Sequence, residues 1–108
     1  MRHDTYTCNQ GCPVEATLEL IGGKWKGVIL YHLMERTYRF GELKKTMPGI
    51  TQRMLTKQLR ELEADGIINR KVYAEVPPKV EYSLTEIGES LRDVVMRMRD
   101  WGRKHFGL

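Results

Sequence analysis

The segment Thr51–Arg70 constrains the fold more than any other, because a single helical stretch carries two separate stripes of side chains. Apolar side chains recur at i, i+4 and i+7 and therefore share one helical face: Leu55, Leu59 and Leu62. Basic side chains recur with the same spacing on another face: Arg53, Lys57 and Arg60. The leucine stripe predicts a helix that packs on a core, and the basic stripe presents hydrogen-bond donors that can reach phosphates and base edges.

The segments on either side of this helix predict a helix-turn-helix with a wing. A short helix over Phe40–Thr46 and a Pro-Gly turn over 47–50 precede it, and Thr51 is a suitable N-cap. Asp65-Gly66 is a stop signal, after which β-forming residues begin. The stretches 67–73 and 80–84, joined by a proline turn at 76–79, predict a β-hairpin with Lys79 at its tip.

Helices are expected on both sides of this central unit. Cys12-Pro13 begins a first helix, which Gly22-Gly23 ends, and a second helix is expected over Lys24–Glu35. A last helix, capped by Thr85, carries apolar residues at helical spacing: Leu91, Val94, Val95, Met98 and Trp101. This stripe lies outside the compact three-helix core, so a second copy of the chain is the simplest surface to cover it.

The fold class is therefore mainly α (α+β), a winged helix-turn-helix with N- and C-terminal dimerisation helices. Residues 1–11 are expected to form a flexible arm and residues 12–108 the domain. Within the domain, residues 12–84 hold the helices and the wing hairpin, and residues 85–108 form the C-terminal dimerisation helix.

Composition narrows the possible functions. The chain has 108 residues, a formal net charge of +4 and no apolar run of transmembrane length or signal-peptide type. A cytoplasmic protein with reduced cysteines, no cofactor and no membrane partner is expected. Enzymes are disfavoured because the chain lacks a phosphate loop, a metal-ligand cluster and a nucleophile motif. We expect surface ion pairs to account for acidic residues such as Glu61 and Asp65.

The expected partner is double-stranded DNA, bound by a homodimer. Base contacts are assigned to the start of the basic helix, where Arg can pair with guanine and Gln with adenine: Thr51, Gln52, Arg53, Thr56 and Lys57. Phosphate contacts are assigned to cations elsewhere: Arg60, Lys24, Lys26, Lys44, Arg70 and Lys79. Each of these residues could instead be an ordinary solvated side chain, and the same fold could serve as a protein-interaction module that binds an acidic partner.

The cysteines offer a second chemistry. At the N-cap, the Cys12 thiol would meet the positive end of a helix, which favours the reactive thiolate. Cys8, four residues upstream, could act as a resolving thiol. The alternatives are a small buried apolar role for Cys12 and no role for Cys8. A metal site formed by Cys8, Cys12 and His3 is disfavoured by its weak spacing.

The chain resembles a known family over Cys12 to about Trp101. Four motifs carry the resemblance in order: C-P-V-E-A-T-L-E-L-I-G-G-K-W-K, F-G-E-L-K-K, I-T-Q-R-M-L-T-K-Q-L-R-E-L-E-A-D-G-I-I-N-R and V-P-P-K-V-E-Y-S-L-T-E-I-G. They are similar to the HxlR-type transcriptional regulators of bacteria, which lie near the MarR regulators. The resemblance implies a dimeric winged-helix DNA-binding regulator, often a repressor.

The resemblance also implies a redox function for Cys12. Several members of the family sense electrophiles or oxidants through a cysteine just before the first helix, the place that Cys12 occupies. Some members bridge that cysteine to a later one across the dimer. No cysteine follows Cys12 in this chain, so that particular bridge cannot form here. A regulator without thiol sensing is the alternative.

Overall fold

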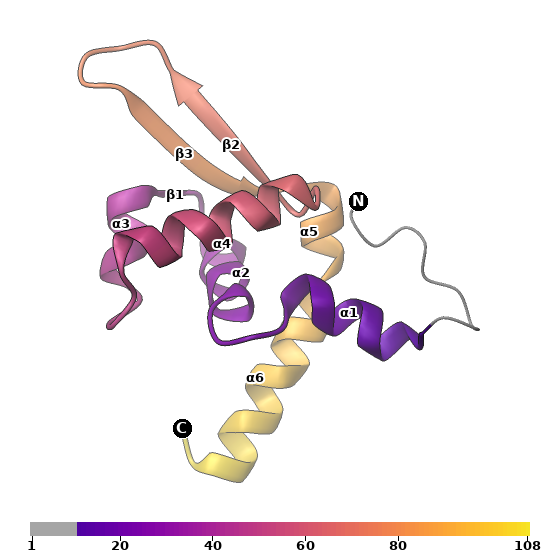
Figure 1. Cartoon of the computed structure of the whole chain (residues 1–108). Coiled ribbons are helices and arrows are strands. Elements are labelled where there is room, and N and C mark those ends of the chain that lie inside the picture. The colour runs from indigo at the N-terminus through magenta and orange to yellow at the C-terminus, as the bar shows by residue number, and fades with distance from the viewer. Residues whose placement is uncertain (1–10) are drawn as a thin grey trace.

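The structure is a computed structural model and describes residues 11–108. Six helices and three strands follow one another in the order α1 Pro13–Ile21, α2 Lys26–Glu35, β1 Tyr38–Arg39, α3 Phe40–Lys45, α4 Gln52–Ala64, β2 Ile68–Tyr73, β3 Lys79–Leu84, α5 Glu86–Ser90 and α6 Arg92–Phe106. The hairpin β2–β3 projects from one end of the molecule and α6 from the other (Figure 1). The arm predicted for residues 1–11 lies, except for Gly11, outside the described residues.

Helices α2, α3 and α4 enclose the core, as the leucine stripe predicts. Leu55, Leu59 and Leu62 on α4 are all buried, and they join Ile29 and Leu30 of α2 in one hydrophobic cluster. Burying a leucine side chain contributes about 1.5–3 kcal/mol, so this stripe alone provides a large part of the stability of a small domain. The turn before α4 contains Gly49 in a left-handed conformation, with φ of 88°.

The wing is an antiparallel hairpin that belongs to a three-stranded sheet of order β1-β3-β2. The sequence analysis did not predict β1, in which Tyr38 pairs with Tyr82 of β3. β2 ends at Tyr73, as predicted, but β3 begins one residue earlier than predicted, so Lys79 is the first residue of β3 rather than the tip. The fold is the predicted winged helix-turn-helix.

The predicted single C-terminal helix is divided in two at Leu91. The hydroxyl group of Thr85, the predicted cap, accepts the Gly88 N–H (3.1 Å) and donates to the Gly66 carbonyl (2.7 Å), which fixes α5 at the end of α4. An Arg92 guanidinium N–H then donates to the Met34 carbonyl at the end of α2 (3.2 Å), where α6 begins. The first contact fixes the start of α5, and the second fixes the start of α6.

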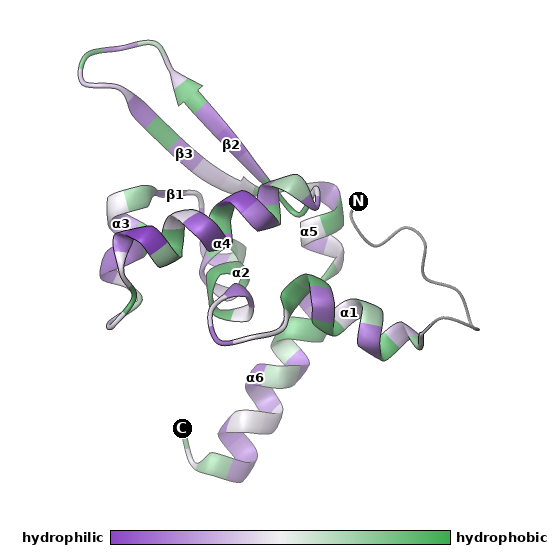
Figure 2. Ribbon diagram, in the orientation of Figure 1, coloured by the Kyte–Doolittle hydropathy of each residue, from purple (hydrophilic) through white to green (hydrophobic). Residues whose placement is uncertain are grey.

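Helices α1 and α6 leave apolar side chains in solvent. Figure 2 shows hydrophobic bands between polar ones along both helices, and the large exposed apolar residues there are Val14, Leu18, Val94, Met98, Trp101 and Phe106. Trp101, for example, is 59% exposed. Of the α6 stripe, Val95 is buried against the body. Among the described residues, no helix has the length and hydrophobicity needed to cross a membrane.

Candidate nucleic-acid interface

Helix α4 begins in solvent with a side-chain cap. The Thr51 hydroxyl oxygen accepts the Met54 N–H (3.0 Å), which satisfies one of the free donors of the first turn. Gln52 and Arg53 follow on the exposed side of this turn. Thr51 is therefore engaged as a cap through its side chain, while Gln52 and Arg53 extend from the end of the helix that a winged helix uses to reach bases.

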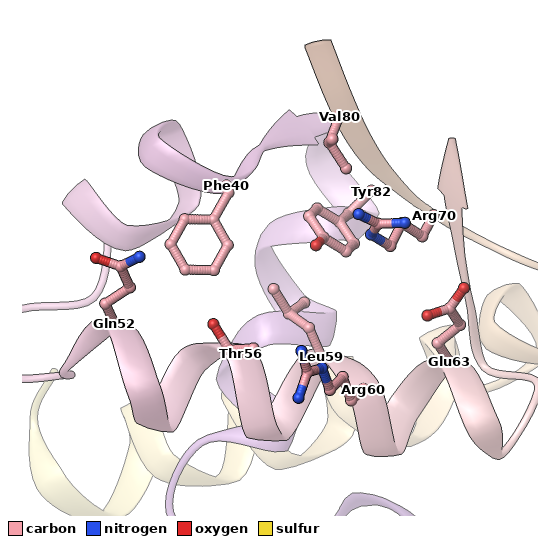
Figure 3. A pocket seen from close by; sticks show the side chains of 9 residues that line it. All are labelled: Phe40, Gln52, Thr56, Leu59, Arg60, Glu63, Arg70, Val80 and Tyr82. Atoms are coloured by element: carbon pink, nitrogen blue, oxygen red, sulfur yellow. The ribbon is translucent and has the colours of Figure 1, made fainter. Parts of the chain in front are cut away.

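A groove of about 500 Å³ runs between α4 and the inner face of the wing (Figure 3). Helix α4 contributes Gln52, Thr56 and Arg60, which follow at i, i+4 and i+8 along one side. Arg70 enters from β2 on the opposite side, where it pairs in register with Tyr82 of β3. Two arginines thus face one groove although ten positions separate them in the sequence, which makes it a suitable seat for a phosphate backbone.

A second set of candidates lies on the adjacent flank of α4. Arg53 and Lys57 line a hollow there together with Thr51 and Met54, and both cations are exposed. The candidates on α4 therefore form two neighbouring rows, one toward the wing and one away from it. The residues assigned to bases are therefore divided between the two rows, with Gln52 and Thr56 on one and Arg53 and Lys57 on the other.

Two of the lysines predicted as phosphate contacts outside α4 are exposed in the structure. Lys44 is exposed near the end of α3. Lys24 is also exposed, and its ammonium group lies 4.7 Å from the centre of the Trp25 ring. Lys24 precedes α2, which begins two residues later than predicted, at Lys26. Lys24 therefore belongs to the turn after α1 and not to the first turn of the helix.

The prediction that Lys26 is a phosphate contact is wrong. Lys26 is only 7% exposed, and its Nζ lies 2.9 Å from Oε2 of Glu61 on α4. The Lys26 ammonium group therefore pairs inside the protein and links the start of α2 to the last turn of α4. The prediction of surface ion pairs holds for Glu42 with Arg36 and for Glu89 with Arg92. It does not describe Glu61, which is half-buried in the contact with Lys26, or Asp65, which is fully buried.

The start of helix α3, which precedes the turn, is fixed by the side chain of Glu42. The Arg39 backbone N–H donates to Oε1 of Glu42 (2.9 Å), and this bond lowers the pKa of that carboxyl group below its ordinary value, with the Arg36 guanidinium adding to the effect. Arg36 lies 3.5 Å from the same carboxylate. The cap holds α3 at the angle from which the turn leads into α4.

Cys12 occupies the N-cap of α1, as predicted, and is exposed. Its Sγ accepts the Glu15 backbone N–H at 3.3 Å, so the sulfur lies at the positive end of the helix. The buried apolar role is excluded for this thiol by its exposure. Cys8 lies outside the described residues.

The family is decided by a match that covers most of the chain. Residues 20–107 match the HxlR-like helix-turn-helix family, and they include every candidate on α2–β3. The chain belongs to the HxlR-like family. Cys12 precedes the matched residues.

Individual relatives agree with this assignment. The chain is 64% identical over 96 residues to the uncharacterized HTH-type transcriptional regulator YdeP of Bacillus subtilis (strain 168). This match covers 89% of this chain and 75% of YdeP. Its structure is similar to the redox regulator HypR in its oxidised form, with 60% identity, a TM-score of 0.84 and coverage of 87% of this chain and 97% of HypR. It is also similar to a protein from Porphyromonas gingivalis W83 assigned to the MarR family, with 37% identity, a TM-score of 0.85 and coverage of 93% and 98%.

The predicted resemblance to HxlR-type and MarR-like regulators is thus confirmed. The protein is a transcriptional regulator with a DNA-binding helix-turn-helix, from a family that is not enzymatic. Within residues 11–108, no group of three His, Cys, Asp or Glu side chains is placed to hold a metal ion.

Two residues that line this groove were not predicted from the sequence. Glu63 lines the groove with Arg60 and Arg70. Its spacing of three residues from Arg60 could have revealed the shared face. The Tyr82 side chain forms part of the opposite wall, and only the register of the sheet places it there.

Proposed function

We propose that this regulator binds a pseudo-palindromic operator as a homodimer and represses transcription by occupying it. The observation that carries the proposal is the exposed start of α4, where Gln52, Arg53, Thr56 and Lys57 lie beside a groove that holds Arg60 and Arg70. Side chains from the first two turns reach base edges, and the cations of the groove and of the wing contact phosphates. Lys24, Lys44 and Lys79 add backbone contacts, and the protein acts in the cytoplasm.

The exposed apolar faces of α1 and α6 support the dimer. Leu18 on α1, with Met98 and Trp101 on α6, would remain in water in a single copy of the chain. A two-fold axis lets each copy cover the other's faces with the same residues. In this assignment residues 85–108 form the dimerisation segment, and residues 12–84 carry the DNA-binding surface.

A two-fold dimer places its two α4 helices in successive major grooves. The expected separation of the half-sites is about 34–36 Å, one turn of B-DNA. The repressor role follows from the family resemblance, since a dimer seated over a promoter excludes polymerase.

Cys12 is proposed as a sensor of oxidants or electrophiles. Two observations support it: the thiol is exposed at a helix N-cap, and the similar protein HypR is a redox regulator with an oxidised form. Modification of Cys12 would disturb the start of α1 next to the dimer surface and so change the spacing of the two α4 helices. Cys8 is proposed as a resolving thiol.

The test is selection of bound fragments from a genomic DNA pool, with and without diamide. The proposal predicts a recovered inverted repeat of one-turn spacing, located at promoters, and loss of recovery with diamide. Recovery without diamide sensitivity would leave a DNA-binding regulator without thiol sensing. Recovery of fragments with no shared sequence would contradict operator binding and favour the protein-interaction alternative.

A further inference from the structure

The wing has two faces, and the function proposed above uses Arg70 on the inner face but only the single cation Lys79 on the outer face. Arg70, Val80 and Tyr82 belong to the inner face, which lines the groove beside α4. Side chains alternate along a strand, so the residues between them point to the outer face. Two neighbouring pairs toward the tip of the outer face are Lys71 opposite Glu81 and Tyr73 opposite Lys79.

These four outer-face side chains form one connected cluster around an aromatic ring. The ammonium group of Lys79 lies 4.2 Å from the centre of the Tyr73 ring, and that of Lys71 lies 4.8 Å from it. The Tyr73 hydroxyl donates to Oε1 of Glu81 at 2.7 Å. The hydrogen bond holds the ring, and the ring holds both cations by cation–π attraction.

The charges of this cluster do not cancel one another. It contains two ammonium groups and one carboxylate, and that carboxylate accepts the tyrosine hydroxyl. A net positive charge therefore remains on the outer face. Free lysine side chains lose much rotamer freedom when they bind, whereas these two are already held in place, so fixing them on a phosphate costs less entropy.

We propose that the outer face of the wing is a second surface for DNA phosphates, in which Tyr73 is a positioning residue for Lys71 and Lys79. Glu81 orients Tyr73 through its hydroxyl. The inner groove contacts one stretch of backbone, and the lysine pair contacts another on the opposite side of the hairpin. This inference rests on the DNA-binding function proposed above.

The test measures affinity for a selected site and for a permuted sequence by fluorescence anisotropy over a range of salt concentrations. The slope of log K against log salt is negative, and each lost phosphate contact lowers its magnitude by about 0.9. Lys71→Gln/Lys79→Gln is expected to lower the magnitude of the slope and to weaken binding to both sequences equally. The matched control is Lys104→Gln, at an exposed position in the last turn of α6. Because α6 belongs to the proposed dimerisation segment, sedimentation velocity first checks that this variant has the oligomeric state of the parent.

Tyr73 is tested by two variants. Tyr73→Leu removes the ring and is expected to weaken binding to both DNA sequences about three- to tenfold. Tyr73→Phe keeps the ring and is expected to stay within about twofold of the parent. In the Lys71→Gln/Lys79→Gln background, Tyr73→Leu should cause no further loss, because the cations that it positions are gone.

Two results would overturn the inference. One is an unchanged salt slope in the double glutamine variant. The other is a Tyr73→Leu loss of the same size with and without the two lysines, which would give the ring a structural role only. If the parent binds no DNA at any salt concentration, the proposed function fails; if the parent binds and the lysine variants bind equally well, only the outer-face surface fails.

Discussion

Lys26 and Glu61 join α2 to α4 inside the protein, with Nζ and Oε2 2.9 Å apart. The contact fixes the helix that carries the candidate base-reading residues to the first turn of the helix behind it. Because Lys26 is buried, its positive charge does not belong to the DNA-binding surface. The contact is a determinant of where α4 lies.

Replacing Lys26 with Met is expected to lower the free energy of unfolding by about 1–3 kcal/mol, because one partner of a largely buried ion pair is lost. Urea unfolding measures the change, and Lys26→Met/Glu61→Leu should recover part of it, since an apolar pair tolerates the same space. The salt slope of DNA binding should stay at the parent value. A slope lowered in magnitude by about 0.9 would instead return Lys26 to the phosphate contacts.

Gly88 of α5 is expected to tolerate no side chain. A Cβ at this position would collide with the Ile67 carbonyl oxygen and would press on Leu84. Gly88→Ala should destabilise the protein by about 1–3 kcal/mol through overpacking. Gly41→Ala in α3 is the matched control: it meets nothing within 4 Å and should stabilise the protein by about 0.5–1 kcal/mol. Equal unfolding midpoints for the two variants would contradict the close approach of α5 to the wing.

Trp101 is expected to lie in the dimer interface. Trp101→Glu places a charge on the exposed apolar face of α6 and should weaken the dimer by about 2 kcal/mol or more, roughly thirtyfold. Val76→Glu in the wing turn, where the side chain is 99% exposed, is the control and should leave the dimer intact. Sedimentation velocity distinguishes the two. A Trp101→Glu variant that stays dimeric over the same concentrations would remove α6 from the interface.

Cys12 is expected to control release from DNA. Diamide should weaken operator binding by the parent about tenfold or more, whereas Cys12→Ser should keep its affinity. Cys8→Ser separates the sensing thiol from the resolving one, because it should still be modified at Cys12. Fluorescence anisotropy with and without diamide measures operator binding by the parent, by Cys12→Ser and by Cys8→Ser. Equal release by the parent and Cys12→Ser would show that this thiol is not the switch.

Local patterns predicted the parts of the fold that depend on neighbours in sequence. The stripe of Leu55 and Leu59 identified the buried face of α4 because helical periodicity repeats within a few residues. Thr51 and Thr85 were predicted as caps for the same reason, since a cap bonds an N–H two or three residues away.

Contacts between distant residues explain what the sequence analysis missed. Lysine is normally a surface residue. Lys26 is buried because it pairs with Glu61, which lies 35 positions away in the sequence. Strand β1 is two residues long and exists because Tyr38 meets Tyr82. The break at Leu91 likewise follows from the contact of Arg92 with Met34 on another helix.

The helix that carries the candidate interface and the types of residue on it were predictable from the sequence. Which of these residues share a groove or a face was not. The basic stripe identified Arg53 and Lys57, which the structure places on one flank of α4. That Arg60 shares a groove with Arg70 and Glu63 depends on how the hairpin folds back over α4. The division of the wing cations between two faces depends on the strand register.

The central claim is that the first two turns of α4 read DNA sequence, and Arg53→Ala tests it most directly. Anisotropy is measured for the parent and the variant on the selected operator and on a permuted sequence, with Arg103→Ala on α6 as the control of equal charge. The account predicts that Arg53→Ala loses about 1–3 kcal/mol on the operator, much less on the permuted sequence, and relaxes the preference at one base pair. Equal affinity of parent and Arg53→Ala for the operator would contradict it.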